Sequence, residues 1–205
     1  MKEVSRATIG RIPRYLQYLK NAPAHTATIS ATTLAHALGL GEVQVRKDLS
    51  AVSGAGRPKI GYQVDSLIGA LESFLAGNPS SGIVIVGAGK LGRALLDYSG
   101  FQAYGLEIAA AFDTAVTAPE TSNSGKPIYA MAELEPYCQT HPVQIGILTV
   151  PATAAQAVAD RLIACGVQAI WCFAPCVLRV PDGISVQYEN MALSLAYLNQ
   201  KIGRS

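Results

Sequence analysis

The residues Gly87-Ala88-Gly89-Lys90-Leu91-Gly92 form a GxGxxG motif between an apolar run at residues 83–86 and a helical pattern at residues 91–98. In this context the first glycine permits a tight turn, the second lets the backbone approach a pyrophosphate, and the third lets the helix pack on the strand. The helix N-terminus adds free N–H groups and a partial positive charge. The motif predicts a dinucleotide-binding Rossmann domain. A Rossmann domain without a nucleotide and a coenzyme A binder are the alternatives.

Asp113 is the acidic residue that such a motif requires further along the chain. It lies 21 residues after Gly92, at the end of the next apolar run. A carboxylate in this place accepts hydrogen bonds from the hydroxyls of the adenosine ribose. It also disfavours the 2′-phosphate of NADP(H), so the predicted cofactor is NAD(H).

The rest of the C-terminal part alternates between apolar runs and helical patterns. The predicted strands span residues 83–86, 106–112, 145–150 and 168–173, with a further strand near 184–188. The predicted helices span residues 91–98, 131–138 and 152–165. Near-continuous apolar strands that alternate with helices are typical of a parallel sheet covered on both faces. The predicted class is therefore α/β, and an apolar helix at residues 191–202 closes the chain.

Charge is distributed unevenly along the chain. Residues 1–60 contain nine Lys and Arg but only three Asp and Glu, a net charge of +6, whereas the remainder has a net charge of −4. This asymmetry predicts a nucleic-acid-binding module attached to an acidic one. No apolar run reaches the roughly 18 residues needed to span a bilayer, and the first residues lack the apolar stretch of a signal peptide. We therefore expect a soluble cytoplasmic protein with no membrane partner.

The basic N-terminal part has the outline of a helix-turn-helix. Apolar residues recur at helical spacing in residues 12–19, and residues 21–23 end this helix. Hydroxyl residues at 28–33 can cap a second helix. A glycine turn at 39–41 then leads into a third helix at 42–52.

A glycine-rich segment at residues 53–62 follows the third helix and is predicted to form a two-stranded wing with a basic tip. After a further helix at 64–75, turn formers at 77–82 mark a domain boundary. The predicted division is a winged-helix domain at residues 1–76, a Rossmann domain at 77–189 and a C-terminal helix at 190–205.

The third helix carries side chains that we expect to read DNA. Arg46 and Lys47 cannot both face inward, so at least one of them projects to solvent or to DNA. Solvation alone is the alternative, but the preceding helix and turn, the basic wing and the segment charge favour DNA. Helix side chains read base edges, while Lys and Arg pair with phosphates. The predicted DNA-binding residues are Arg11, Gln44, Arg46, Lys47, Ser50, Arg57 and Lys59.

No set of residues typical of an enzyme is found in the sequence. An oxidoreductase needs a second domain that holds its substrate, and residues 1–75 are too few and too basic for that task. His141 precedes Pro142 in a predicted surface connection, where a solvated histidine is favoured over a catalytic one. The four cysteines lack zinc-binding spacing and are predicted to be small, buried and reduced. We expect no catalytic residue and no metal site.

Several segments resemble the Rex family of redox-sensing repressors. They are Val45-Arg46-Lys47-Asp48-Leu49-Ser50, Gly61-Tyr62, residues 86–95, Phe112-Asp113, residues 147–152 and Phe173-Ala174-Pro175, and they cover nearly the whole chain in the family order. The resemblance implies a homodimeric transcriptional repressor that binds palindromic operator DNA and releases it when NADH replaces NAD+. It also implies a C-terminal helix that is swapped between the subunits. The cofactor-binding residues predicted from the motif and the resemblance are Gly87, Ala88, Gly89, Lys90, Leu91, Gly92, Tyr98, Asp113, Thr149, Val150, Pro151, Phe173, Ala174 and Pro175.

Two charged residues of the Rex pattern are missing. Gln17 replaces the second arginine of a first helix that resembles Arg-Leu-Pro-x-Tyr-x-Arg-x-Leu, and Ala192 replaces the aspartate of Asn-Val-Asp-Leu. In the family these two residues, with the tyrosine matched by Tyr98, change partners with the redox state of the nicotinamide. The predicted function is therefore that of an NAD(H)-sensing repressor whose response to NADH is weakened or rewired. The alternatives are a Rex-like paralogue with weak or no NADH response or with another ligand, and a small NAD-dependent oxidoreductase.

Overall fold

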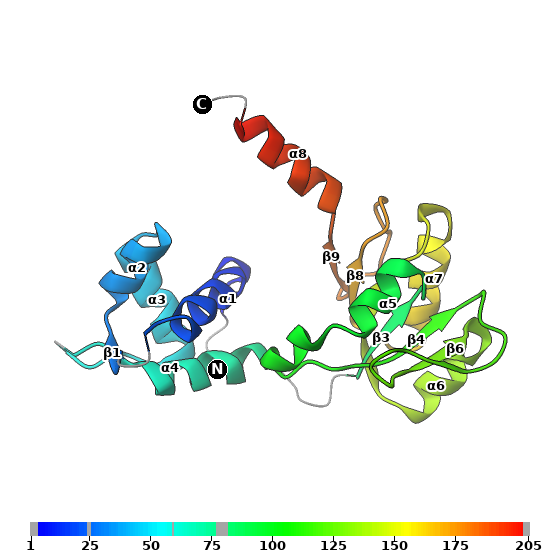
Figure 1. Cartoon of the computed structure of the whole chain (residues 1–205), viewed down its shortest axis with the longest axis horizontal. Coiled ribbons are helices and arrows are strands. Elements are labelled where there is room, and N and C mark those ends of the chain that lie inside the picture. Colours follow the sequence, from blue (N-terminus) through cyan, green and yellow to red (C-terminus); the bar gives the residue numbers. More distant parts are fainter. Residues whose placement is uncertain (1–3, 24–25, 59, 77–81, 203–205) are drawn as a thin grey trace. The chain divides into compact units, whose positions relative to one another are not determined.

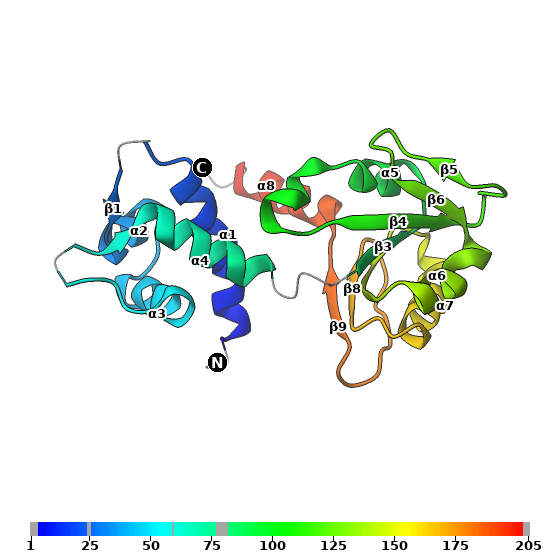
Figure 2. The same cartoon turned by 90° about the horizontal axis from the view of Figure 1, so that it is seen from below.

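The computed structural model describes residues 4–23, 26–58, 60–76 and 82–202. The chain divides into two compact units, which comprise Met1–Pro79 with Ala103–Gly105, and Ser80–Gln102 with Leu106–Ser205. Figure 1 and Figure 2 show the helices and strands of both units from two directions. Each unit has an apolar core of its own.

The first unit is a helical bundle with a short antiparallel pair of strands. Its elements are α1 (Arg6–Lys20), β1 (Thr28–Ile29), α2 (Ala31–Leu38), α3 (Glu42–Ser53), β2 (Tyr62–Gln63) and α4 (Val64–Ala76). Leu16, Leu34 and Leu49 are fully buried and join α1, α2 and α3 in its core. The side chain of Ser30 caps α2 by accepting a hydrogen bond from the Thr33 amide at 2.9 Å, which confirms the predicted hydroxyl cap.

The segment after α3 differs from the predicted two-stranded wing. Arg57 and Gly61 form only an isolated bridge, with the Arg57 amide donating to the Gly61 carbonyl at 2.8 Å. The next strand, β2, pairs instead with β1, which the sequence analysis missed because it is a two-residue strand with no apolar run. Gly61 permits this pairing: its φ is +86°, and a Cβ there would lie 2.3 Å from the carbonyl oxygen of Ile29. The two sides of the predicted wing are therefore joined by one bridge and not by two full strands.

The second unit is a twisted sheet in the order β5-β6-β4-β3-β7-β8-β9. The strands are β3 (Gly82–Val86), β4 (Ile108–Asp113), β5 (Glu120–Thr121), β6 (Pro127–Ala130), β7 (Val143–Leu148), β8 (Ala169–Cys172) and β9 (Ser185–Tyr188). Every pairing is parallel except that of the edge strand β5 with β6. Leaving out β5, the order is that of a dinucleotide-binding fold, and the chain reverses its direction of winding between β3 and β7. The prediction of a parallel sheet is confirmed.

Helices cover both faces of this sheet, as Figure 2 shows for α5 on one face and for α6 and α7 on the other. The helical elements are α5 (Lys90–Leu96), η1 (Ser99–Tyr104), η2 (Met131–Glu133), α6 (Leu134–Thr140), α7 (Ala152–Ala164) and α8 (Met191–Ile202). Successive residues of β3 point to opposite faces, so Ile85 packs in the core that contains Leu96 of α5, and Val84 in the core that contains Leu162 of α7. Both faces are therefore apolar, and the central strands read as continuous apolar runs.

The helix α8 has no buried residue. Its apolar side chains are mostly exposed, from 56% for Leu198 to 77% for Ile202. Its bounds agree with the predicted helix at residues 191–202. None of the helices in the described ranges has the length and apolar character needed to cross a membrane.

Candidate functional site

The glycine loop between β3 and α5 has the geometry that the GxGxxG motif predicts. Gly87 has a φ of +102°, and a Cβ there would lie 2.8 Å from the backbone of Thr149. A Cβ on Gly92 would lie 1.9 Å from the carbonyl oxygen of Gly87, so only glycine allows α5 to pack this close to the strand. By contrast, a Cβ on Gly89 would meet no atom within 4 Å. The space above Gly89 is therefore open to a ligand.

Asp113 lies beside this loop, at the end of β4. Its Oδ2 accepts a hydrogen bond from the Ala88 amide at 2.6 Å, and its Oδ1 accepts one from the Ala115 amide at 2.8 Å. The carboxylate thus ties the loop to the neighbouring strand. Asp113 also lines the pocket at the strand ends. Its contact with a ribose stays a prediction.

Two further side chains hold the loop from either side. The Thr149 hydroxyl, just after β7, donates to the Gly87 carbonyl at 2.6 Å. Arg93 donates through Nε to the Ala88 carbonyl at 2.9 Å and through Nη2 to Glu120 at 2.7 Å. The role of Arg93 was not predicted, because its partner Glu120 is 27 residues away. The loop is therefore held in place by its neighbours.

A pocket of about 330 Å³ opens at the carboxyl ends of β3, β4 and β7. This is the edge at which open parallel sheets bind ligands. The predicted residues that line it are Gly87, Gly89, Asp113, Thr149, Val150 and Pro151. The lining residues that were not predicted are Val86, Thr114, Met131, Ala154, Ala157, Val158 and Arg161. Helical spacing in α7 could have indicated Ala154, Ala157 and Val158, because they share one side of that helix.

The remaining predicted nucleotide residues lie outside this pocket. Ala88, Lys90, Leu91 and Gly92 belong to the loop and to the first turn of α5. Tyr98, Phe173, Ala174 and Pro175 do not line the pocket.

A chain of aromatic rings connects Tyr98 with Phe173 on the α5 face of the sheet. The ring of Tyr98 meets Phe101 edge to face, with centroids 5.1 Å apart, and Phe101 meets Trp171 in the same way at 6.1 Å. Trp171 in turn contacts Phe173 at 4.6 Å and donates through Nε1 to Glu189 at 3.2 Å. Tyr98 itself is 58% exposed. The structure therefore brings Tyr98 and Phe173 to one side of the unit, joined through two intervening rings.

The helix α3 has an exposed side and a buried side, and the buried side includes one charged residue, Asp48. Val45, Asp48 and Leu49 are buried. The four residues of α3 predicted to read DNA, namely Gln44, Arg46, Lys47 and Ser50, are all exposed. The guanidinium of Arg46 pairs with Glu42 one turn earlier, while Lys47 forms no ion pair within the described residues.

A hollow of about 360 Å³ lies between the start of α2, α3 and the wing turn. Arg46 from α3 and Arg57 from the turn both line it, so the structure brings these two predicted DNA-binding residues together. Both side chains are exposed. Lys59, which was also predicted to bind DNA, lies outside the described residues.

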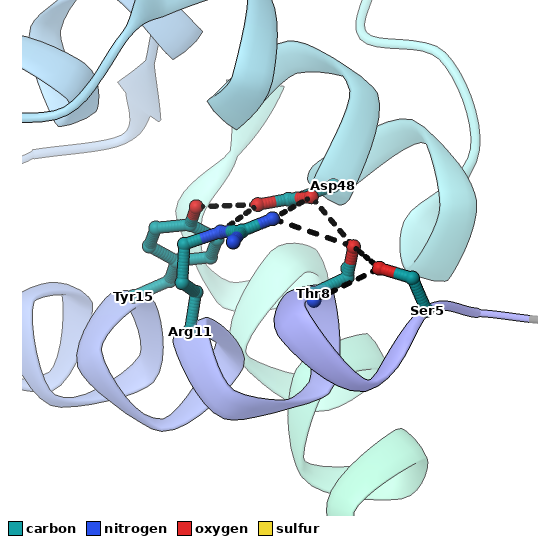
Figure 3. Close-up of polar contacts among 5 residues, drawn as sticks. All are labelled: Ser5, Thr8, Arg11, Tyr15 and Asp48. Atoms are coloured by element: carbon teal, nitrogen blue, oxygen red, sulfur yellow. Dashed lines mark hydrogen bonds and ion pairs between the residues drawn. The ribbon is translucent and has the colours of Figure 1, made fainter.

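Arg11 is placed differently from the other predicted DNA-binding residues. Its Nε and Nη2 donate to Oδ2 and Oδ1 of Asp48 at 2.7 and 2.9 Å, and its side chain is only 19% exposed. Figure 3 shows the cluster around Asp48, which also accepts hydrogen bonds from Tyr15 and Thr8. The guanidinium is held inside the unit by a carboxylate, so we retain for Arg11 only an indirect role at the DNA surface.

The electrostatics of this cluster favour the charged forms of the ion pair. Burial by itself would raise the pKa of Asp48, but hydrogen bonds from Arg11, Tyr15 and Thr8 outweigh it, and the pKa of Asp48 is lowered. The hydrogen bond with Asp48 raises the pKa of Arg11. Burial and the nearby carboxylate raise the pKa of Tyr15 to about 12. Asp48 therefore stays ionised and Tyr15 stays neutral at physiological pH.

His141 and the four cysteines line neither of the two hollows described above. His141 is exposed, as predicted, and its ring stacks on Tyr137 at a centroid distance of 4.1 Å. The four cysteines are free, but only Cys172 is buried as predicted, whereas Cys138, Cys165 and Cys176 are half-buried.

Comparisons with known proteins found two family models, one for each part of the chain, and relatives that match nearly all of it. A family described as "CoA binding domain" matches residues 78–176, and one described as "Putative DNA-binding protein N-terminus" matches residues 3–50. A "Redox-sensing transcriptional repressor Rex" of Porphyromonas gingivalis is 40% identical over 197 residues, which cover 96% of this chain and 90% of the relative. A protein of the same name from Treponema denticola is 40% identical over 192 residues, covering 93% and 91% of the two chains. One from Streptomyces coelicolor is 37% identical over 196 residues, covering 95% and 76%.

Solved structures match over the same length. The structure of "RSP in complex with beta-NAD+ and operator DNA" has a TM-score of 0.88 and 30% identity, and the match covers 98% of this chain and 94% of that one. The structure of "RSP in complex with beta-NADH" has a TM-score of 0.86 and 30% identity, covering 98% and 95%. The similarity thus includes both units.

Proposed function

The chain belongs to the family of Rex redox-sensing transcriptional repressors, and from this premise we propose that it binds operator DNA through its first unit and NAD(H) through its second. The chain is a regulator and not an enzyme, in keeping with the relatives that carry the repressor name. The observation that carries the proposal is the glycine loop, which is open above Gly89 and flanked by the Asp113 carboxylate. NAD(H) is favoured over coenzyme A because solved relatives contain beta-NAD+ or beta-NADH.

The second unit offers a separate place for each part of the dinucleotide. The pyrophosphate would lie over Gly89 at the N-terminus of α5, where the first N–H groups of a helix lack partners within the helix. Asp113 would accept hydrogen bonds from the ribose, and the apolar walls of the 330 Å³ pocket would take up the adenine. The nicotinamide would then extend toward Phe173 and Tyr98. In this assignment, each group of residues predicted to bind the nucleotide contacts one part of it.

The first unit offers a basic surface for a duplex. Gln44, Arg46, Lys47 and Ser50 are exposed on one helix, which would enter the major groove and read base edges. Arg57, beside the same hollow as Arg46, would contact phosphates. We place this function in the cytoplasm, where a bacterial repressor meets its operator.

We also propose that the protein acts as a homodimer on a palindromic operator. The support is α8, whose apolar residues Leu195, Leu198 and Ile202 are 56–77% exposed within the chain. Such a stripe is stabilised when a partner covers it, and a swapped helix from a second copy would do so. Sedimentation of the parent protein, compared with a variant carrying Leu195→Lys and Leu198→Lys, tests this assignment. A parent that sediments as a monomer would contradict it.

A second candidate, a Rex-like repressor with a weak NADH response, is favoured by one observation. Gln17 and Ala192 replace the arginine and aspartate of the Rex pattern. Titration of the protein–operator complex with NADH and with NAD+ distinguishes the two candidates. We expect both nucleotides to bind and NADH to release the DNA, and no nucleotide binding in calorimetry would contradict both candidates.

A further inference from the structure

Asp48 is a buried carboxylate in the middle of the helix that carries the DNA-reading side chains. Its side chain is 4% exposed. Figure 3 shows that its partners all come from α1. Arg11 donates to both oxygens, the Tyr15 hydroxyl donates to Oδ2 at 2.7 Å, and the Thr8 hydroxyl donates to Oδ1 at 2.9 Å. One charged residue of α3 is thus held by three side chains of another helix.

This arrangement limits how α3 can sit on the unit. Apolar packing of Val45 and Leu49 tolerates small rotations and shifts of a helix, because dispersion contacts are not directional. A buried carboxylate does not tolerate them, since it is stable only while its oxygens keep their donors. The position of α3 is therefore set by Asp48 more sharply than by the apolar residues beside it.

Arg11 extends this connection to the DNA-facing side of α3. In the orientation that satisfies both groups, the Gln44 side-chain oxygen accepts hydrogen bonds from Nη1 of Arg11 at 2.9 Å and from Nε at 3.3 Å. Gln44 lies one turn before Asp48 on α3, so Arg11 contacts both of them. The NH₂ group of Gln44 then lies on the side of the amide away from Arg11, where a donor can meet a base edge.

We propose that Asp48 is a positioning residue for base recognition: it holds Arg11, and Arg11 holds the amide of Gln44 in the orientation that reads DNA. Asp48 also neutralises Arg11, so this guanidinium does not add to sequence-independent attraction of phosphates. The inference rests on the proposed DNA-binding function. It predicts that loss of the Asp48 charge lowers discrimination between sequences while leaving attraction to any duplex intact or stronger.

The test measures affinity for two duplexes of equal length and composition. One is a palindromic site that the parent protein selects from random-sequence DNA, and the other is its scrambled form. For Asp48→Asn we expect the preference for the selected site to fall about tenfold, and the salt dependence of scrambled-site binding to rise by about one unit as Arg11 becomes free. The matched control is Glu72→Gln. It removes the carboxylate that pairs with Lys20 of α1, so it changes the charge equally and frees a basic side chain of the same helix without touching α3.

A double-mutant cycle shows whether Asp48 acts through Gln44. If it does, Asp48→Asn combined with Gln44→Ala loses no more preference than the larger of the two single changes. Additive losses would overturn the proposal. So would an Asp48→Asn variant that loses stability but keeps its preference for the selected site.

If Asp48→Asn does not fold, Tyr15→Phe is the deciding variant, because it removes one hydrogen bond and keeps the ion pair. We expect it to lower the preference about two- to threefold, and no change would overturn the proposal. A parent protein that selects no site contradicts the proposed function itself, and this is seen before any variant is compared.

Discussion

The glycine loop of the second unit and the exposed side of α3 are the two proposed binding surfaces, but different parts of the chain build them. In the loop the backbone makes the surface, because Gly87 and Gly92 exclude any side chain. On α3 the surface consists of side chains, and its placement depends on hydrogen bonds between residues 33 to 40 positions apart. A surface made by backbone can be recognised from a local motif. One made by side chains depends on contacts that the local sequence does not contain.

The largest expected effect comes from Gly89→Val, which tests whether the loop binds through its backbone. Gly89 has an ordinary extended φ of −70°, and a Cβ added there meets no protein atom within 4 Å, so we expect the fold to survive. The branched side chain would occupy the place of the pyrophosphate. Loss of two charge-assisted hydrogen bonds of ~1.5–3 kcal/mol each lowers NAD(H) affinity by about 100-fold or more. Calorimetry and thermal unfolding measure the two properties separately.

Gly92→Val is the matched comparison for this variant. Its side chain would collide with the Gly87 carbonyl, so we expect a lower melting temperature together with weaker binding. Wild-type NAD(H) affinity in a folded Gly89→Val protein would show that the ligand does not approach the loop backbone.

Asp113→Ala tests the side chain within the surface that is otherwise made by backbone. The change removes the predicted ribose acceptor and also the hydrogen bond to the Ala88 amide. At ~1.5–3 kcal/mol for a charge-assisted contact, NAD(H) should bind about ten- to 100-fold more weakly. The preference for NAD(H) over NADP(H) should narrow, because the repulsion of a 2′-phosphate is gone. A loss that is equal for both nucleotides would leave Asp113 with a structural role only.

Arg46→Ala and Lys47→Ala test the surface made by side chains. Both residues are exposed, so we expect melting temperatures close to that of the parent. Operator affinity should fall about tenfold, and each lost phosphate contact should reduce the salt slope by about one unit. Lys20→Ala, a basic residue of α1 paired with Glu72, is the control and should leave operator binding unchanged. Unaltered affinity in both α3 variants would remove this helix from the DNA interface.

The smallest expected effect is on communication between the two surfaces. NADH shifts the DNA-bound and released states only through contacts that differ between them. Gln17 can still form hydrogen bonds, whereas Ala192 cannot replace an aspartate. Restoring one charge-assisted contact of ~1.5–3 kcal/mol by Gln17→Arg with Ala192→Asp should lower the NADH concentration for half-release about tenfold. Either change alone should help less.

This last prediction has a direct control in the parent protein, titrated under the same conditions. Release of the parent from its operator at low NADH, with no gain in the double variant, would show that the missing charges do not limit the response.

The sequence predicted those elements whose signals are local. The glycine motif, the alternating apolar strands and the third helix all lie within a few residues of their expected places. The strands β5 and β6 were missed because they are short: β5 has two polar residues, and the four residues of β6 run directly into the helical pattern at residues 131–138. The wing was predicted as two strands, but its two sides are joined by a single bridge between Arg57 and Gly61, since glycine content indicates a turn but not the length of the strands beside it.

The candidate sites also differ in whether their signals are local. The roles of Gly87, Gly89 and Gly92 follow from spacing alone. The pairing of Arg11 with Asp48 could not be predicted from spacing, because the two residues are 37 positions apart. An acidic residue placed between Val45 and Leu49 on the buried side of α3 was the available signal, since a carboxylate there needs a partner.

The ring contacts of Trp171 have a spectroscopic consequence. It is the single tryptophan of the chain, and it lies between Phe101 and Phe173. A reduced nicotinamide ring absorbs light in the range where indole emits, whereas an oxidised ring does not. A nicotinamide bound near Phe173 would therefore quench the fluorescence of one known residue by energy transfer only in its reduced form. The protein would thus contain an optical reporter of the oxidation state of its own ligand.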